Sequence, residues 1–330
     1  VAEMVCQEYV CGYFGKWHLG DEFHAQHGFE TWVSIDDIPA YYPEENPPDR
    51  SSDYHRFLVE QGFSPDVEVP GTRIFGRNLA AGLPEHLTKA AFLGRKVAEF
   101  IRNNRDRPFV ACANFHEPHS PFTGPFDDLY DADEIPVGPA FMKVPNEKAS
   151  LLHQRLGRWY SRAQFKGFDL TEAPGWQRLR TQYLGLVTLV DRAVGGILRA
   201  LEESGQWEET MVVFTSDHGE MAGDHSLVTK GVMYEEAVRV PLLIRAPGYA
   251  PRNVPGCMSL ADLTPTLLEM MGEQVPEGLH GQSCAGLFEH EDDLSANDTF
   301  IEWNGEDGRD RPGPHPVVEN EEEARILKQP

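Results

Sequence analysis

The chain has 330 residues, of which 29 are basic and 53 are acidic, so its formal net charge at pH 7 is −24. This charge argues against nucleic acid as a partner, because binding to phosphate backbones requires clustered basic residues. An apolar content of 40% and a charged content of 25% indicate a globular chain, and no apolar run approaches the ~20 residues that a membrane-spanning helix needs.

Apolar periodicity predicts helices and strands that alternate along the chain. In chain order we expect the last turns of an amphipathic helix over 1–9, a strand over 12–17, a helix over 88–104, a strand over 108–114, a long helix over 174–205, strands over 210–216 and 240–245, and a helix over 262–271. This alternation predicts an α/β fold with a largely parallel sheet. Between the first expected strand and the helix over 88–104 lies a proline-dense loop at 39–48. The segment 122–173 has the composition of an insertion that covers the site.

The apolar stripes of the two long helices predict which faces lie toward the core. In the first helix the expected core-facing residues are Ala91, Phe92, Val97, Phe100 and Ile101. In the second they are Leu184, Val187, Val190, Val194, Ile197, Leu198 and Leu201.

The segment 215–231 is the most informative part of the chain. It follows Met211–Phe214, an apolar run that predicts a buried strand, and open α/β sheets bind their ligands beyond the carboxyl ends of strands. Asp217 and His218 can offer an oxygen and a nitrogen to a metal, and Lys230 can bring positive charge to an anion. The alternative is that Asp217 opens a turn and caps the next helix.

Two further segments combine a strand end with polar side chains. Lys16 and His18 are two residues apart on a segment expected to be extended, so they should point the same way, with Trp17 toward the core. Such a pair suits an anion or a developing oxyanion, and the alternative is a surface pair.

The second of these segments is Asn114–Pro121, which contains two histidines. His116, Glu117 and His119 are either ligands or turn residues stiffened by the neighbouring prolines. If the segment stays extended, His119 faces away from His116, so one metal should not bind both histidines.

These motifs resemble a known family. Gly12–Gly20 (GYFGKWHLG) is similar to the second sulfatase signature almost letter for letter, and Glu117–Pro121 resembles the central histidine motif of sulfatases. The segment 215–231, with the MYEE and RVPL runs after it, resembles their second metal-binding segment. The resemblance is to the sulfatase branch of the alkaline phosphatase superfamily.

The resemblance implies a fold and an activity. The fold would be an alkaline-phosphatase-like sandwich of a mostly parallel sheet between helices, with residues 1–290 forming a partial catalytic domain and 291–330 beginning an acidic, truncated C-terminal subdomain. The activity would be hydrolysis of sulfuric esters (EC 3.1.6-like) of a small molecule or glycan. Two alternatives stay open: a phosphonate or phosphate mono/diester hydrolase of the same superfamily, and a non-catalytic relative that binds a sulfated glycan. The substrate, compartment and oligomeric state stay open as well.

The resemblance also implies residue roles. Asp217 and His218 would bind a divalent metal, Ca²⁺ by analogy with the family, with Mn²⁺ as the alternative because imidazole nitrogen is softer than the ligands Ca²⁺ prefers. Lys16 would hold the nucleophile's hydrate and a sulfate oxygen. His18 would take the proton when the covalent sulfo-enzyme collapses to the aldehyde. His119 and Lys230 would bind sulfate oxygens and neutralise charge at the leaving oxygen.

Two features of the family are missing from these residues. Sulfatases use a formylglycine made from Cys or Ser in Cys-x-Pro-x-Arg or a close variant. No cysteine here has an arginine four residues later; the cysteines are Cys6, Cys11, Cys112, Cys257 and Cys284. The upstream Asp-Asp metal pair is absent too. We therefore expect a fragment whose nucleophile lies before Val1 and which is inactive by itself.

Overall fold

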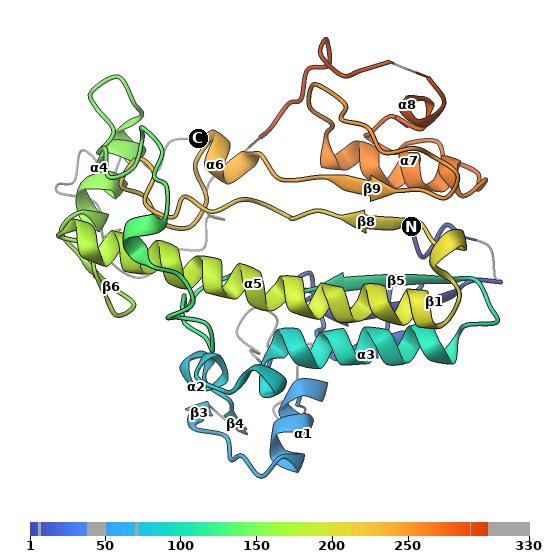
Figure 1. Ribbon diagram of the computed structural model, residues 1–330, viewed down its shortest axis with the longest axis horizontal. Helices are drawn as coiled ribbons and strands as arrows, with labels where there is room; N and C mark the ends of the chain where they lie inside the picture. Colours follow the sequence, from blue (N-terminus) through green and yellow to red (C-terminus); the bar gives the residue numbers. More distant parts are fainter. Residues whose placement is uncertain (6–7, 38–50, 70–71, 291, 303–330) are drawn as a thin grey trace. The chain divides into compact units, whose positions relative to one another are not determined.

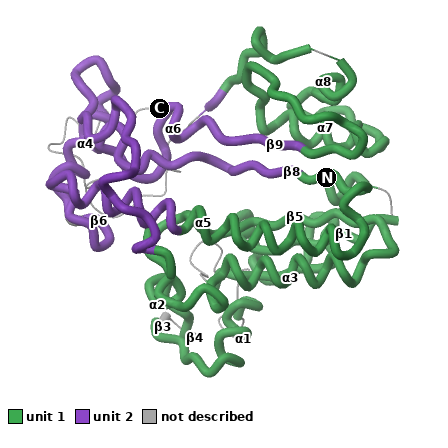
Figure 2. Tube along the Cα trace, viewed as in Figure 1, with its two compact units in different colours: residues 1–126, 186–212, 245–300 green, residues 127–185, 213–244, 301–330 purple. Residues whose placement is uncertain are grey.

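The computed structural model describes residues 1–5, 8–37, 51–69, 72–290 and 292–302. The chain forms two compact units (Figure 2). One unit comprises 1–126, 186–212 and 245–300, and the other comprises 127–185, 213–244 and 301–330. The proline-dense loop at 39–48 and most of the acidic segment 291–330 lie outside the described residues. The expected domain boundary at 290 therefore stays a prediction.

The first unit contains a parallel sheet of three strands in the order β2-β1-β5 (Figure 1). β1 (Val10–Gly15) is central and pairs in parallel with β2 (Thr31–Val33) and β5 (Phe109–Asn114). All six residues of β1 are buried, as expected of a central parallel strand covered on both faces. The predicted parallel α/β arrangement is confirmed.

β1 ends at Gly15, two residues before the predicted end of this strand. Gly15 has φ 123°, which favours glycine, and a Cβ there would lie 1.9 Å from the Asn114 carbonyl oxygen. His18 has φ 63°, so Lys16 and His18 do not lie on an extended segment. The alternation argument for a common direction of these two side chains is therefore wrong.

Helix α3 (Lys89–Asn103) confirms the predicted helix over 88–104. Thr88 is its N-cap, and the Thr88 hydroxyl accepts a hydrogen bond from the Ala91 amide. The buried face includes Phe92, Leu93, Val97, Phe100 and Ile101, whereas Ala91 is half-buried. Phe100 meets Phe14 of β1 edge to face at 5.3 Å between ring centroids, so α3 covers the sheet through its predicted apolar face.

Helix α5 (Ala173–Glu203) confirms the predicted long helix, but its predicted core face is partly wrong. Leu186 and Leu189 are buried, whereas Val187 is 40% exposed. Both faces carry apolar residues here, so periodicity alone does not select one. Close packing on α3 selects the face: a Cβ added to Gly94 of α3 would lie 3.2 Å from the Ala193 Cβ.

The remaining elements are short. The first unit also contains α1 (Asp53–Glu60), the antiparallel strands β3 (Val67–Val69) and β4 (Thr72–Ile74), α2 (Arg77–Ala81), α7 (Leu263–Met270) and α8 (Gly286–Glu289). The second unit contains α4 (Leu151–Tyr160), the antiparallel strands β6 (Gln164–Phe165) and β7 (Phe168–Asp169), and α6 (Glu235–Val238). β8 (Val212–Phe214) and β9 (Leu243–Arg245) form a two-stranded sheet. The predicted strands over 210–216 and 240–245 and the helix over 262–271 are thus confirmed with shorter bounds.

The predicted helix over 1–9 is wrong for its described residues, which form a turn with only one i→i+4 backbone bond, from the Val5 amide to the Val1 carbonyl. A single such bond does not offset the cost of nucleating a helix.

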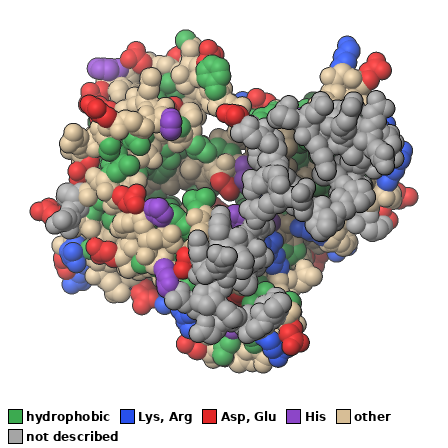
Figure 3. All heavy atoms as spheres, turned by 180° about the vertical axis from the view of Figure 1, so that it is seen from behind, with side chains coloured by type: hydrophobic (Ala, Val, Ile, Leu, Met, Phe, Trp, Pro, Cys, Tyr) green, Lys and Arg blue, Asp and Glu red, His purple; other side chains and the backbone are tan. Residues whose placement is uncertain are grey.

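The described part of the chain contains no helix that is both long and apolar enough to cross a membrane. Acidic, basic and apolar side chains are intermixed on the face seen in Figure 3.

Candidate functional site

Two predicted motifs meet at the carboxyl ends of neighbouring parallel strands. Lys16 follows β1 and His119 lies in the loop after β5, and these strands pair along their whole length. Beyond the last strand pair, the Lys16 amide donates to the Asn114 carbonyl at 3.2 Å. Lys16 and His119 are both half-buried. This strand edge is where open α/β folds place their ligand sites.

Two polar side chains, those of Tyr13 and Asn114, hold the backbone at Lys16 through hydrogen bonds. The side-chain Nδ2 of Asn114 donates to the Tyr13 hydroxyl at 2.6 Å, and the Tyr13 hydroxyl donates to the Lys16 carbonyl. Tyr13 is 2% exposed, and burial raises its pKa. The hydroxyl therefore keeps its proton and remains a donor to Lys16.

Glu22 holds the next two residues. Its buried carboxylate accepts hydrogen bonds from the His18 amide at 2.8 Å and from the Trp17 amide at 3.1 Å. Its carbonyl accepts from the Trp32 indole at 2.8 Å. Burial raises the pKa of Glu22, and the two backbone bonds oppose this rise. Sequence reasoning missed this residue, although an acid four residues after a predicted site histidine was a usable signal.

Trp17 packs inward, as predicted. Its ring meets Tyr13 edge to face at 5.0 Å, contacts Trp32 at 5.3 Å and stacks on His27 at 5.3 Å between ring centroids. This aromatic cluster is a rigid support beneath the exposed His18.

The loop after β5 sets the tautomer of His119. The His119 amide donates to the His116 carbonyl at 3.0 Å, which closes a turn. The His119 Nδ1 lies 2.9 Å from the Ser120 carbonyl oxygen, so Nδ1 carries a hydrogen. His116 is buried beside it, with 5.0 Å between the two ring centroids.

In the second unit, Asp217 and His218 follow β8 as predicted. β8 itself is less buried than expected: Phe214 is 44% exposed, and among the described residues β8 pairs only with β9. No helix of the described residues begins between Asp217 and α6, so the capping alternative for Asp217 is wrong.

The side chains of Asp217 and His218 lie next to each other. The His218 Nδ1 lies 2.8 Å from the Gly219 carbonyl, which makes Nδ1 the protonated nitrogen and turns the Nε2 lone pair outward. That Nε2 lies 3.3 Å from the Asp217 carboxylate. Two lone-pair atoms at this distance repel unless a proton or a metal ion lies between them. Among the described residues no group of three or more His, Cys, Asp or Glu could hold a metal, so the metal role of Asp217 and His218 stays a prediction.

Lys230 ends a tightly tied loop. The Met221 amide donates to the Thr229 carbonyl at 3.0 Å. Inside the loop the half-buried Glu220 carboxylate accepts from the amides of Ala222 and Thr229. Burial raises the pKa of Glu220, and the charge of Lys230 opposes this rise. Glu220 is thus a second supporting acid that sequence reasoning missed.

The structure gathers the predicted residues as two sets of three. Lys16, His18 and His119 lie in the first unit. Asp217, His218 and Lys230 lie in the second. Their assembly into one site stays a prediction.

Comparisons with known proteins identify the family. The sulfatase family profile matches residues 3–273. The multifunctional alkaline phosphatase superfamily protein PehA of Trinickia caryophylli is 30% identical over 285 residues, which cover 82% of this chain and 49% of PehA. Choline-sulfatase of Rhizobium meliloti is 29% identical over 289 residues, which cover 82% of this chain and 51% of that enzyme.

A solved structure agrees with these relatives. The phosphonate monoester hydrolase SpPMH from Silicibacter pomeroyi matches with a TM-score of 0.60 and 25% identity, over 79% of this chain and 52% of that one. The chain spans about half the length of the curated relatives it matches. The family profile covers most of the chain, and the predicted alkaline-phosphatase-like fold is confirmed. The chain therefore belongs to the sulfatase family.

Proposed function

We propose that the protein containing this chain hydrolyses sulfate esters. The observation that carries the proposal is the meeting of Lys16 and His119 at the ends of two paired parallel strands, in a chain of the sulfatase family. Cationic and N–H groups fixed in advance stabilise the charge that builds on sulfate oxygens in the transition state.

Each group of the first unit has a proposed task. Lys16 places its ammonium on a sulfate oxygen and on the nucleophile. His119, with Nδ1 committed to the Ser120 carbonyl, binds a second sulfate oxygen through Nε2 when protonated. His18, on a loop held by Glu22, takes the proton that ends the cycle. The proposed nucleophile is a formylglycine outside residues 1–330.

The second unit supplies the remaining groups in this proposal. Lys230 neutralises charge at the leaving oxygen. Asp217 and His218 would hold a divalent cation, Ca²⁺ in our proposal with Mn²⁺ as the alternative, which would orient the sulfate and offset its negative charge. The 3.3 Å spacing of their ligand atoms supports this assignment.

The test is hydrolysis of 4-nitrophenyl sulfate by the complete protein, co-expressed with a formylglycine-generating enzyme. We expect turnover, and a loss of roughly 100-fold or more in kcat/KM for Lys16→Ala. Lys96→Ala is the matched control, because Lys96 is an exposed lysine of α3 paired with Glu99. Protein that carries formylglycine by mass spectrometry but releases no sulfate would contradict the proposal. The 330-residue chain alone should be inactive, since it lacks the nucleophile.

A second candidate is phosphonate monoester hydrolysis, which the similarity to PehA and to the Silicibacter pomeroyi enzyme supports. The Gly15–Gly20 segment favours sulfate. The ratio of kcat/KM for 4-nitrophenyl sulfate to that for a phenylphosphonate monoester separates the two: a ratio below one selects the phosphonate.

For the natural substrate we propose a sulfated glycan. N-acetylglucosamine-6-O-sulfatase of Bacteroides thetaiotaomicron is 34% identical over 151 residues, which are 45% of this chain and 27% of that enzyme. Sulfate release from sulfated oligosaccharides tests this proposal. Binding of the same oligosaccharides without any sulfate release would instead select the non-catalytic alternative.

A further inference from the structure

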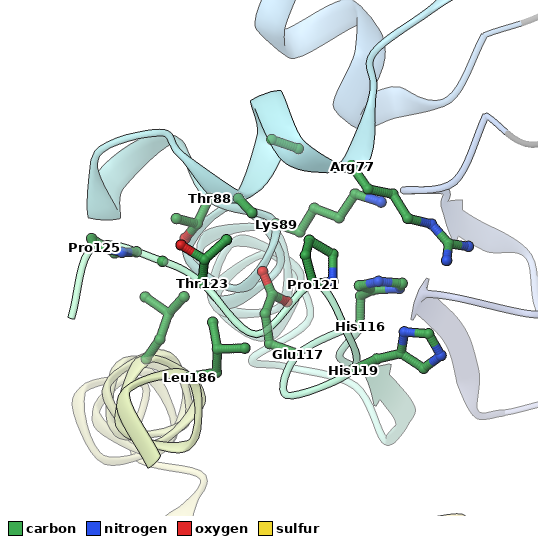
Figure 4. Close-up of a pocket in the computed structure, with 14 residues that line it drawn as sticks. Arg77, Thr88, Lys89, His116, Glu117, His119, Pro121, Thr123, Pro125 and Leu186 are labelled. Carbon is green, nitrogen blue, oxygen red and sulfur yellow. The ribbon is translucent and has the colours of Figure 1, made fainter. Parts of the chain in front are cut away.

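A small cavity lies beside the loop that carries His119 (Figure 4). Its volume is about 30 Å³, and one water needs roughly 10–15 Å³. The cavity therefore has room for about two waters or for one end of a larger ligand. Arg77, Lys89 and His116 line its polar side, whereas Leu186 and Leu189 of α5 line its apolar side. All of these residues belong to the first unit.

His116 is a buried polar group without a protein partner. It is 8% exposed, and neither ring nitrogen has a hydrogen-bond partner among the described residues. Burial lowers its pKa well below the ordinary value, and the nearby cations lower it further; these are Lys89, His119, Arg77 and Lys16. The ring is therefore neutral and carries one N–H that lacks an acceptor, which is costly in a buried position.

Arg77 has the same deficiency. Its Nε is buried with no hydrogen-bond partner, and within the described residues its guanidinium forms no ion pair. Figure 4 shows the Arg77 guanidinium near the rings of His116 and His119, with all three side chains directed to the same side of the pocket. A guanidinium that is buried in part and lacks a carboxylate is poised to bind an anion.

Lys89 and Glu117 also line the cavity, and the Oε2 atom of Glu117 is buried with no hydrogen-bond partner in the described part of the chain. Lys89 lies 3.9 Å from the Asp36 carboxylate and also near Glu117. Glu117 accepts hydrogen bonds from its own amide and from the Ala90 amide at the start of α3, and burial raises its pKa. Arg77 is thus the cation at this cavity whose charge no described acid offsets.

We propose that Arg77 and His116 form an anion subsite for a second oxyanion of the substrate, a carboxylate or sulfate carried next to the ester that is hydrolysed. The inference rests on the proposed function, in which His119 meets the ester's sulfate. The 5.0 Å between the His116 and His119 ring centroids makes the two anionic groups neighbours on one ligand. The N–H groups of Arg77 and His116 then gain charge-assisted hydrogen bonds.

The test compares aryl sulfates that differ only beside the ester: unsubstituted, ortho-carboxylate and ortho-sulfonate. In the complete protein, Arg77→Gln should lower kcat/KM for the two charged substrates by about tenfold or more relative to the unsubstituted one. Arg73→Gln is the matched control, because Arg73 is an exposed arginine of β4. If Arg77→Gln lowers kcat/KM for only one of the two charged substrates, the charged group of that substrate is the one that the subsite prefers. An unchanged ratio for both overturns the subsite and leaves the proposed function standing.

A second measurement does not depend on catalysis. In protein labelled with ¹³C at the histidine Cε1, inorganic sulfate or benzoate should shift the His116 signal saturably. The shift should persist in Arg73→Gln and disappear in Arg77→Gln. Absence of a saturable shift in folded wild-type protein overturns the subsite. A saturable shift in protein that hydrolyses no aryl sulfate supports the subsite and contradicts the proposed hydrolysis.

Discussion

Glu22 offers the sharpest test of how the Lys16–Gly20 loop is held. Its carboxylate accepts two backbone hydrogen bonds, from Trp17 and His18. A hydrogen bond to a charged group contributes roughly 1.5–3 kcal/mol, so the pair contributes at most about 3–6 kcal/mol. Two terms reduce this sum. Burial disfavours the charged carboxylate, as the raised pKa of Glu22 indicates, and the exposed His18 amide can bind water once it is released.

We therefore expect Glu22→Ala to lower the free energy of unfolding by about 2–3 kcal/mol. His18 has φ 63°, and a non-glycine residue holds that conformation only where its surroundings impose it. Without the carboxylate the loop should open first, before the rest of the unit. A loss of about 2 kcal/mol corresponds to roughly 30-fold faster amide exchange at Trp17 and His18. Glu22→Gln keeps one acceptor and should give an intermediate effect.

The assay is hydrogen–deuterium exchange resolved at Trp17 and His18, with urea unfolding for the global free energy. Asp21→Ala is the control, because its carboxylate accepts from the amides of Phe23 and His24. Unchanged exchange at Trp17 and His18 in Glu22→Ala, or equal acceleration in Asp21→Ala, would refute this reasoning.

Three further predictions follow from the structure. Gly15→Ala should destabilise the protein by about 3 kcal/mol or more, because a Cβ there meets backbone at 1.9 Å; urea unfolding should show a smaller loss for Gly62→Ala, where φ is also positive at 87° but no atom lies within 4 Å. Since burial raises the folded-state pKa of Glu22, the folded state binds more protons than the unfolded state between the two pKa values. The stability that protonation of Glu22 adds is therefore complete below the unfolded pKa and is lost as pH rises through the folded pKa, whereas the two backbone hydrogen bonds to the carboxylate remain. Urea midpoints across acidic pH should fall more steeply with rising pH in wild type than in Glu22→Gln, because other acids, Glu117 and Glu220 among them, contribute equally to both proteins. In the proposed sulfatase, steady-state kinetics should show a larger loss of kcat/KM for Asp217→Asn than for Lys230→Ala, because the metal orients the other groups; the opposite order would contradict the metal assignment.

The sequence by itself determined the elements whose information is local. The apolar stripe predicted α3 within one residue at each end. The apolar runs of β1 and β5, each followed by polar residues, predicted two parallel strands that carry Lys16 and His119. These features depend on neighbours within a few positions, so periodicity suffices to read them.

Only the tertiary structure decided where strands stop and which polar groups lack partners. β1 ends at Gly15, where the Asn114 carbonyl of another strand occupies the space of a side chain and only glycine fits. The buried face of α5 follows from its contact with α3. Arg77 looks ordinary in the sequence, and His116 was a possible ligand or a turn residue; they become a candidate anion subsite because α2 and the loop after β5 place them beside one cavity. Burial and hydrogen-bond satisfaction are set by residues distant in the chain, so no local pattern encodes them.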